Sequence, residues 1–139
     1  MLNCLRNILV KCQPFAKYIL VFWIITIIVF SSLPASMIPN LGVDRILIRI
    51  DYIAHFSEYG LLAFLSLLTF SGRQLSLSRR LTIRIVVLLS LFALGDEFHQ
   101  LLIPTRTFSY LDLLADFAGL ITAVVLFAII VKNGNRGQN

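Results

Sequence analysis

Two carboxylates and a histidine occur at helical spacing in one short stretch of the sequence. Asp51, His55 and Glu58 follow an i, i+4, i+7 pattern, so in a helix their side chains share one face. A histidine beside carboxylates can transfer protons, and the same groups can bind a polar ligand through hydrogen bonds. An apolar run follows them, and charged side chains are costly in such surroundings. These three residues are therefore the first candidates for a functional site.

Further polar groups recur at the same spacing later in the chain. Glu97 and Gln100 are one helical turn apart, as are Asp112 and Asp116. Arg106 lies between these pairs, and its planar guanidinium can bind a phosphate through two parallel hydrogen bonds. We expect all these groups to form one binding site, made of Asp51, His55, Glu58, Tyr59, Glu97, Gln100, Arg106, Asp112 and Asp116.

The composition places these residues in a membrane protein. The chain has 139 residues, of which 58% are hydrophobic and 14% charged, whereas soluble domains carry about 25% charge. Four apolar segments are long enough to cross a hydrocarbon core of about 30 Å. The sequence predicts an all-α integral membrane bundle of four transmembrane helices in a single domain, residues 1–139, with spans at about 15–33, 50–70, 81–103 and 111–131.

The basic residues indicate how the bundle is oriented. Nine of the twelve lie beside what would be one end of it: Arg6, Lys11, Lys17, Arg73, Arg79, Arg80, Arg84, Lys132 and Arg136. Because Lys and Arg accumulate in cytoplasmic segments, both termini should be cytoplasmic. The first segment also resembles a signal peptide, but we favour a retained helix, and the orientation is the same either way. All seven acidic residues and both histidines then fall in the outer half. We therefore expect a hydrated polar pocket that opens outward.

Two stretches resemble the signatures of the VanZ-like family of integral membrane proteins. "DYIAHFSEYGLL" is similar to the first signature, and "DEFHQLLIPTRTFSYLDLLADFAG" to the second. Two positions depart from the family pattern, which usually has Lys at Tyr52 and Asn at Asp116. The resemblance covers roughly residues 15–131 and implies a multi-pass protein of the bacterial plasma (inner) membrane. The family takes its name from a protein associated with resistance to teicoplanin, a lipoglycopeptide. The resemblance implies no settled biochemical activity. Matches fall at Asp51, His55, Phe56, Tyr59, Leu62, Asp96, Glu97, Gln100, Pro104, Arg106, Asp112, Ala115 and Gly119.

Three functions are compatible with these residues. The first is binding of membrane lipids, a lipid-linked cell-wall precursor or another cell-envelope ligand such as a lipoglycopeptide. The second is an enzyme acting on a lipid phosphate or lipid-linked glycan, with His55 as general base oriented by Asp51 or Glu58. The third is a structural protein whose polar side chains only join its helices. The net charge of +5 lies mainly on the inner side, so nucleic acid is not an expected partner.

Four of the polar residues also have a spacing found in metal sites. His55 with Glu58, and Asp96 with His99, have the i, i+3 spacing of di-iron carboxylate bundles. His99 lies outside the family pattern, however, so the sequence predicts no metal and no other cofactor. The ligand, any catalysis and the oligomeric state are left open by the sequence.

Overall fold

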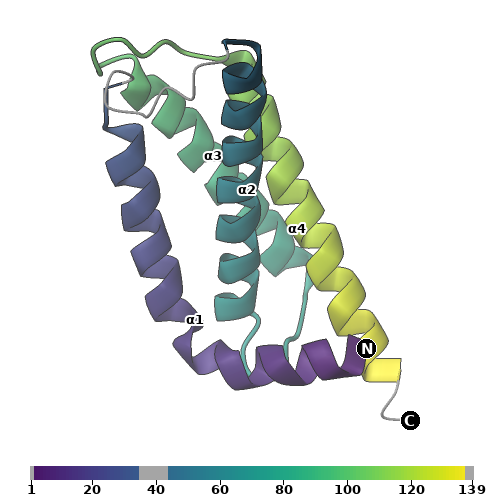
Figure 1. Ribbon diagram of the computed structural model, residues 1–139. Helices are drawn as coiled ribbons and strands as arrows, with labels where there is room; N and C mark the ends of the chain where they lie inside the picture. The colour runs from purple at the N-terminus through teal and green to yellow at the C-terminus, as the bar shows by residue number, and fades with distance from the viewer. Residues whose placement is uncertain (1, 35–43, 137–139) are drawn as a thin grey trace.

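Four helices make up most of the molecule. The computed structural model describes residues 2–34 and 44–136, and within them the side chains of residues 3–34 and 51–132. The helices are α1 (Leu2–Ser31), α2 (Asp44–Phe70), α3 (Arg79–Gln100) and α4 (Tyr110–Arg136), and they run alternately up and down (Figure 1). The all-helical prediction is confirmed. Most of the first predicted connection, and the side chains of Asp44, Arg45 and Arg49, lie outside the described part.

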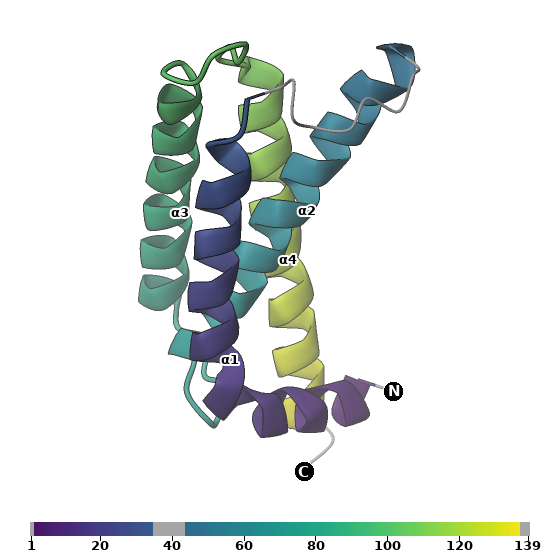
Figure 2. The same ribbon diagram turned by 60° about the vertical axis from the view of Figure 1, so that its left-hand side comes forward.

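The first helix is longer than the sequence suggested, and it is bent. The predicted span starts near residue 15, whereas α1 begins at Leu2 and contains Pro14. A proline inside a helix removes one backbone hydrogen bond and clashes with the preceding turn, which bends the helix. The segment before the proline lies across one end of the bundle, close to the end of α4, while the rest of α1 runs along the bundle (Figures 1 and 2).

Three described helices are long and apolar enough to cross a membrane: Asn3–Ser31, Asp51–Phe70 and Tyr110–Lys132. The third helix, α3, is different because every 18-residue window in it holds at least three charged residues. It also ends at Gln100, short of the predicted residue 103. Composition therefore supports three of the four predicted spans.

Glycines bring α2 and α4 into backbone contact. A Cβ atom at Gly119 would stand 2.0 Å from the carbonyl oxygen of Phe56, and one at Gly60 would stand 3.4 Å from the carbonyl oxygen of Gly119. Leu120 and Ala123 continue this buried face of α4 toward Ala63 of α2. The small residues Gly119 and Ala123 therefore allow α4 to pack closely against α2. The helices α2 and α4 run in the same direction (Figure 1), so residues about one turn before the contact on each helix lie at a similar height along the bundle.

The helices α1 and α3 pack against this pair through apolar side chains, and they also carry apolar side chains on their outer surfaces. Leu20 and Ile27 of α1 share a core with Leu62 of α2 and Ala93 of α3. The indole nitrogen of Trp23 donates a hydrogen bond to the carbonyl oxygen of Glu58, 3.1 Å away, and joins α1 to α2. Many large apolar side chains remain exposed on all four helices, among them Phe22, Leu61, Leu88, Leu91, Leu114 and Ile129. Such a surface is typical of helices that face lipid.

Candidate functional site

The crossing of α2 and α4 sets His55 against two aspartates. The Nδ1 atom of His55 lies 3.0 Å from Oδ1 of Asp116, and its Nε2 atom lies 3.9 Å from Oδ2 of Asp112. His55 is just over one turn before Gly60, and Asp116 is one turn before Gly119. Because the helices are parallel and cross at these glycines, the two side chains reach the same level. Asp112 lies one further turn back along α4.

Glu97 joins α3 to the beginning of α4. Its Oε2 atom accepts a hydrogen bond of 2.8 Å from the backbone N–H of Ser109. The hydroxyl oxygen of Ser109 in turn accepts from the backbone N–H of Asp112 at 3.2 Å, which caps the helix. Carboxylates near a helix N-terminus are favoured by the exposed N–H groups there. Glu97 and Asp112 are therefore both held at the start of α4.

We call His55, Glu97, Asp112 and Asp116 the carboxylate cluster. Single ligand atoms of His55, Glu97 and Asp116 lie within 4.8 Å of one another. The four residues expose only 6%, 1%, 6% and 2% of their surface, in sequence order. Two carboxylate oxygens of the cluster, Oε1 of Glu97 and Oδ1 of Asp112, are buried without a hydrogen-bond partner among the described residues, as is the hydroxyl of Tyr59. Among the described side chains, His55 provides the only ion pairs of these carboxylates.

Asp51 connects the carboxylate cluster to the surface. It is exposed, yet its carboxylate lies within 4.8 Å of ligand atoms of both His55 and Asp112. The first turns of α2 lean away from the other helices (Figure 2). Glu58 is half-buried and belongs to neither of the compact groups found among the described residues. Of the predicted shared face, Asp51 and His55 thus belong to one compact group with Asp112, and Glu58 lies outside that group.

Arg106 and Gln100 have different partners from those expected. Arg106 donates through Nε to the carbonyl oxygen of Leu33 at 3.3 Å, and no described carboxylate lies within 4.0 Å of it. Gln100 donates to Asp96 over a long 3.5 Å contact. Among the described residues, therefore, neither side chain forms an ion pair or a hydrogen bond with the carboxylate cluster.

Three serines at this end of the bundle were missed by sequence reasoning. Ser31 donates a hydrogen bond to Asp96, and the hydroxyl of Ser32 lies 3.1 Å from Nε2 of His99. These contacts join the end of α1 to α3. Ser109 was also missed, although its place three residues before Asp112 is a sequence signal for a helix cap.

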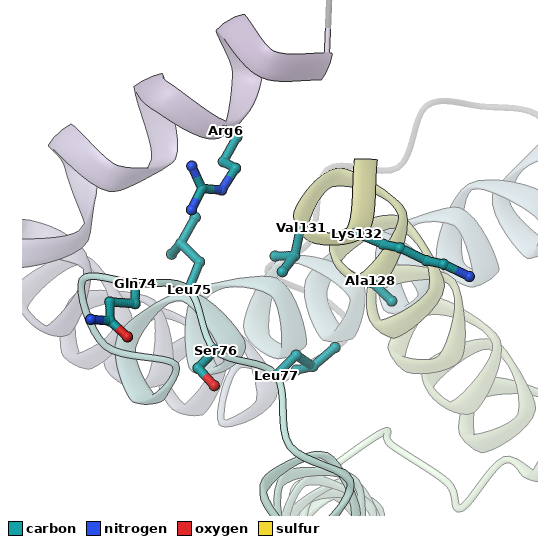
Figure 3. Close-up of a pocket in the computed structure, with 8 residues that line it drawn as sticks. All are labelled: Arg6, Gln74, Leu75, Ser76, Leu77, Ala128, Val131 and Lys132. Carbon is teal, nitrogen blue, oxygen red and sulfur yellow. The ribbon is translucent and has the colours of Figure 1, made fainter. Parts of the chain in front are cut away.

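A pocket of about 680 Å³ lies at the opposite end of the bundle (Figure 3). Arg6 points from α1 toward the loop at Leu75, whereas Lys132 points away from it. The charged residues that line this pocket are basic, so the pocket is not the acidic one predicted from the sequence. An outward opening at the carboxylate cluster stays a prediction. The lining residues are Arg6, Gln74, Leu75, Ser76, Leu77, Ala128, Val131 and Lys132.

The carboxylate cluster can support two kinds of chemistry. An imidazole between carboxylates can accept and release a proton, and here Asp116 holds the Nδ1 atom of His55. The sequence had assigned that orienting role to Asp51 or Glu58. Imidazole and carboxylate groups at this separation are also ligands for a metal ion. The di-iron spacing in the sequence does not produce such a site among the described residues. Glu58, Asp96 and His99 belong to no group of three candidate ligands within 4.8 Å of one another.

Apolar outer faces, three helices able to span a membrane and a buried polar centre define an integral membrane protein with a helical bundle fold. Residues 9–131 match the family model described as VanZ/LLP1. The chain belongs to this family, which confirms the resemblance noted in its two signatures. No curated protein and no solved structure shows significant similarity to the chain.

Proposed function

We propose that this VanZ-family protein binds the polar head group of an outer-leaflet ligand at its carboxylate cluster. The observation that carries the proposal is the continuity from exposed Asp51, through His55, to buried Asp116 and Glu97. A solvent-exposed entrance that leads to buried acceptors is what a head-group site requires. Polar residues that only joined helices would not need an exposed carboxylate at their margin.

The proposal includes a four-span topology in a bacterial plasma membrane, with both termini in the cytoplasm. The helix in question is α3, whose 22 residues correspond to a length of about 33 Å. Its acidic Glu97 is buried among the other helices, while Leu88 and Leu91 in its middle are exposed. A helix with a lipid-facing apolar side and inward-facing charges can span a bilayer despite its composition. The predominance of basic residues near the other end supports the orientation.

The ligand chemistry follows from the groups available. Ionised carboxylates only accept hydrogen bonds, so Asp51 and Asp112 suit a head group with hydroxyl or ammonium donors. Arg106 is half-exposed near this end and provides a cation for a phosphate. A lipid-linked sugar phosphate, such as a cell-wall precursor, offers both groups. A lipoglycopeptide offers the hydroxyls and is the second ligand class to test.

The test is mass spectrometry of lipids that co-purify with the protein in mild detergent. We expect wild type to retain a lipid with a glycosyl or phosphorylated head group, and Asp51→Asn to retain several-fold less. Asp51 is exposed, so this substitution should leave the fold intact. Ser57→Ala, at an exposed position on another face of α2, is the matched control and should retain the lipid. Equal retention of the lipid by Asp51→Asn and wild type would contradict the proposal that Asp51 forms the entrance of the site.

A further inference from the structure

We propose that His55, Glu97 and Asp116 bind a divalent transition-metal ion, with Asp112 beside it. This site goes beyond the head-group site and does not require that ligand. The three residues come from α2, α3 and α4, so one ion would join three helices. Their candidate ligand atoms already lie within 4.8 Å of one another.

The separations suit a metal site that closes around its ion. In a site with bonds of about 2.1 Å, neighbouring ligand atoms are roughly 3.0 to 3.4 Å apart. The Nδ1 atom of His55 and Oδ1 of Asp116 are 3.0 Å apart, which matches this spacing. Glu97 offers a third ligand atom within 4.8 Å of the other two, and a bound ion would draw its carboxylate closer.

A buried carboxylate oxygen without a hydrogen-bond partner among the described residues is a second, independent observation. Glu97 is 1% exposed, and while Oε2 accepts from Ser109, Oε1 has no hydrogen-bond partner in the part of the chain that the structure describes. Buried polar atoms are nearly always paired, so each exception needs an explanation. The same is true of Oδ1 of Asp112, whose other oxygen is the one near His55. A cation at the centre of the carboxylate cluster would give these oxygens a partner.

Charge leads to the same conclusion. When all three carboxylates of the cluster are ionised, a protonated His55 balances only one of their negative charges. Arg106 forms no ion pair with a described carboxylate within 4.0 Å, and its described hydrogen bond is to Leu33. Buried charges require a partner or a metal ion. A divalent cation offsets two negative charges.

The donor set indicates the class of metal. One imidazole with carboxylates suits Zn²⁺, Mn²⁺ or Fe²⁺, whereas Cu⁺ prefers sulfur ligands. Cys4 and Cys12 are exposed at the start of α1 and belong to neither compact ligand group. The N–H of Ser109 fixes one oxygen of Glu97, as outer hydrogen bonds often orient metal ligands.

Metal content and metal-dependent stability test the proposal. The protein is purified through a tag without histidine, stripped with EDTA, and then titrated with Zn²⁺ or Mn²⁺. We expect about one ion per chain by elemental analysis and a rise in the melting temperature that EDTA reverses. Glu97→Gln and Asp116→Asn should lose both effects. Glu58→Gln, a change to a half-buried carboxylate outside the cluster, is the control and should keep both.

Electron spin-echo spectroscopy of the Mn²⁺-loaded wild type keeps the test informative where a variant fails to fold. The chain has two histidines, so a coupling characteristic of an imidazole nitrogen must come from His55 or His99. The coupling should persist in His99→Gln and vanish in His55→Gln. A wild type with no bound ion and no thermal shift overturns the site, as does an equal loss in Glu58→Gln. Lipid retention by the EDTA-stripped protein is measured separately, so a failed metal site and a failed head-group site give different results.

Discussion

Gly119 of α4 lies directly against the backbone of α2 at Phe56. A Cβ atom at Gly119 would be 2.0 Å from the Phe56 carbonyl oxygen and 2.9 Å from its carbon. Because the obstructing atoms belong to a helix backbone, no side-chain rotation can relieve the contact. This one approach sets the spacing of α2 and α4, and with it the contact of His55 with Asp116.

Gly119→Ala should therefore force the two helices apart. We expect a loss of about 3 kcal/mol in the free energy of unfolding, because overpacking against backbone cannot relax. Gly60→Ala, with its closest contact at 3.4 Å, should cost less. Gly95→Ala is the control, since a Cβ there meets nothing within 4 Å and alanine favours helix by about 1 kcal/mol. Fluorescence of Trp23, the single tryptophan, can follow unfolding in detergent. Equal stability of the three variants would contradict the proposed crossing.

Ser109→Ala tests how the start of α4 is held. The substitution removes the hydroxyl that accepts from Asp112 and should lower stability by about 1 kcal/mol. Ser78→Ala removes a comparable cap from α3, at Leu81, and should cost a similar amount. Only the Ser109 variant should also weaken metal or lipid retention, because Ser109 adjoins Glu97 and Asp112. Thermal unfolding and retention are measured on the same preparations.

Cysteine labelling tests the topology. Exposed Cys4 and Cys12 must first be changed to serine. A cysteine introduced at exposed Ser76 should then react with an impermeant maleimide only from inside, and one at exposed Thr107 only from outside. These two positions lie at opposite ends of α3, so the experiment decides whether that helix spans the membrane. Labelling of both from one side would exclude the four-span arrangement.

Arg106→Lys separates phosphate recognition from a purely structural role. Losing the Nε bond to Leu33 should cost about 1 kcal/mol, so the variant should remain folded. It should nevertheless lose a phosphorylated lipid, because a lysine cannot make the two parallel hydrogen bonds of a guanidinium. Arg106→Ala should lose the lipid as well, and Arg84→Lys, at an exposed site on α3, is the control. A lysine variant that keeps the lipid as wild type does would return Arg106 to the structural role.

Helical spacing in the sequence was sufficient to predict part of the site, but not all of it. It predicted the shared face of Asp51 and His55 and the inward position of Asp116. Each of these depends on periodicity within one helix. The pairing of His55 with Asp116 depends instead on how α2 and α4 are rotated and shifted, which spacing alone does not determine.

The outcomes for Arg106 and α1 have similar physical reasons. Arg106 lies in a connection, where no helical period fixes the direction of its side chain, and it turns to the carbonyl of Leu33. The hydropathy pattern places the first span after Pro14, and proline usually ends a helix. Here the helix continues from Leu2 through that proline, with a bend.

The bend in α1 has a consequence for the membrane around the protein. The segment before Pro14, residues 2–13, is about 18 Å long and roughly 10 Å wide, and it lies across the bundle at one end only. Lying flat in the membrane surface, this segment would cover on the order of 200 Å² of one leaflet. It should therefore displace lipid from the leaflet at its own end of the bundle, and bilayers whose two leaflets differ in area, as they do where a membrane curves, should accommodate it most easily.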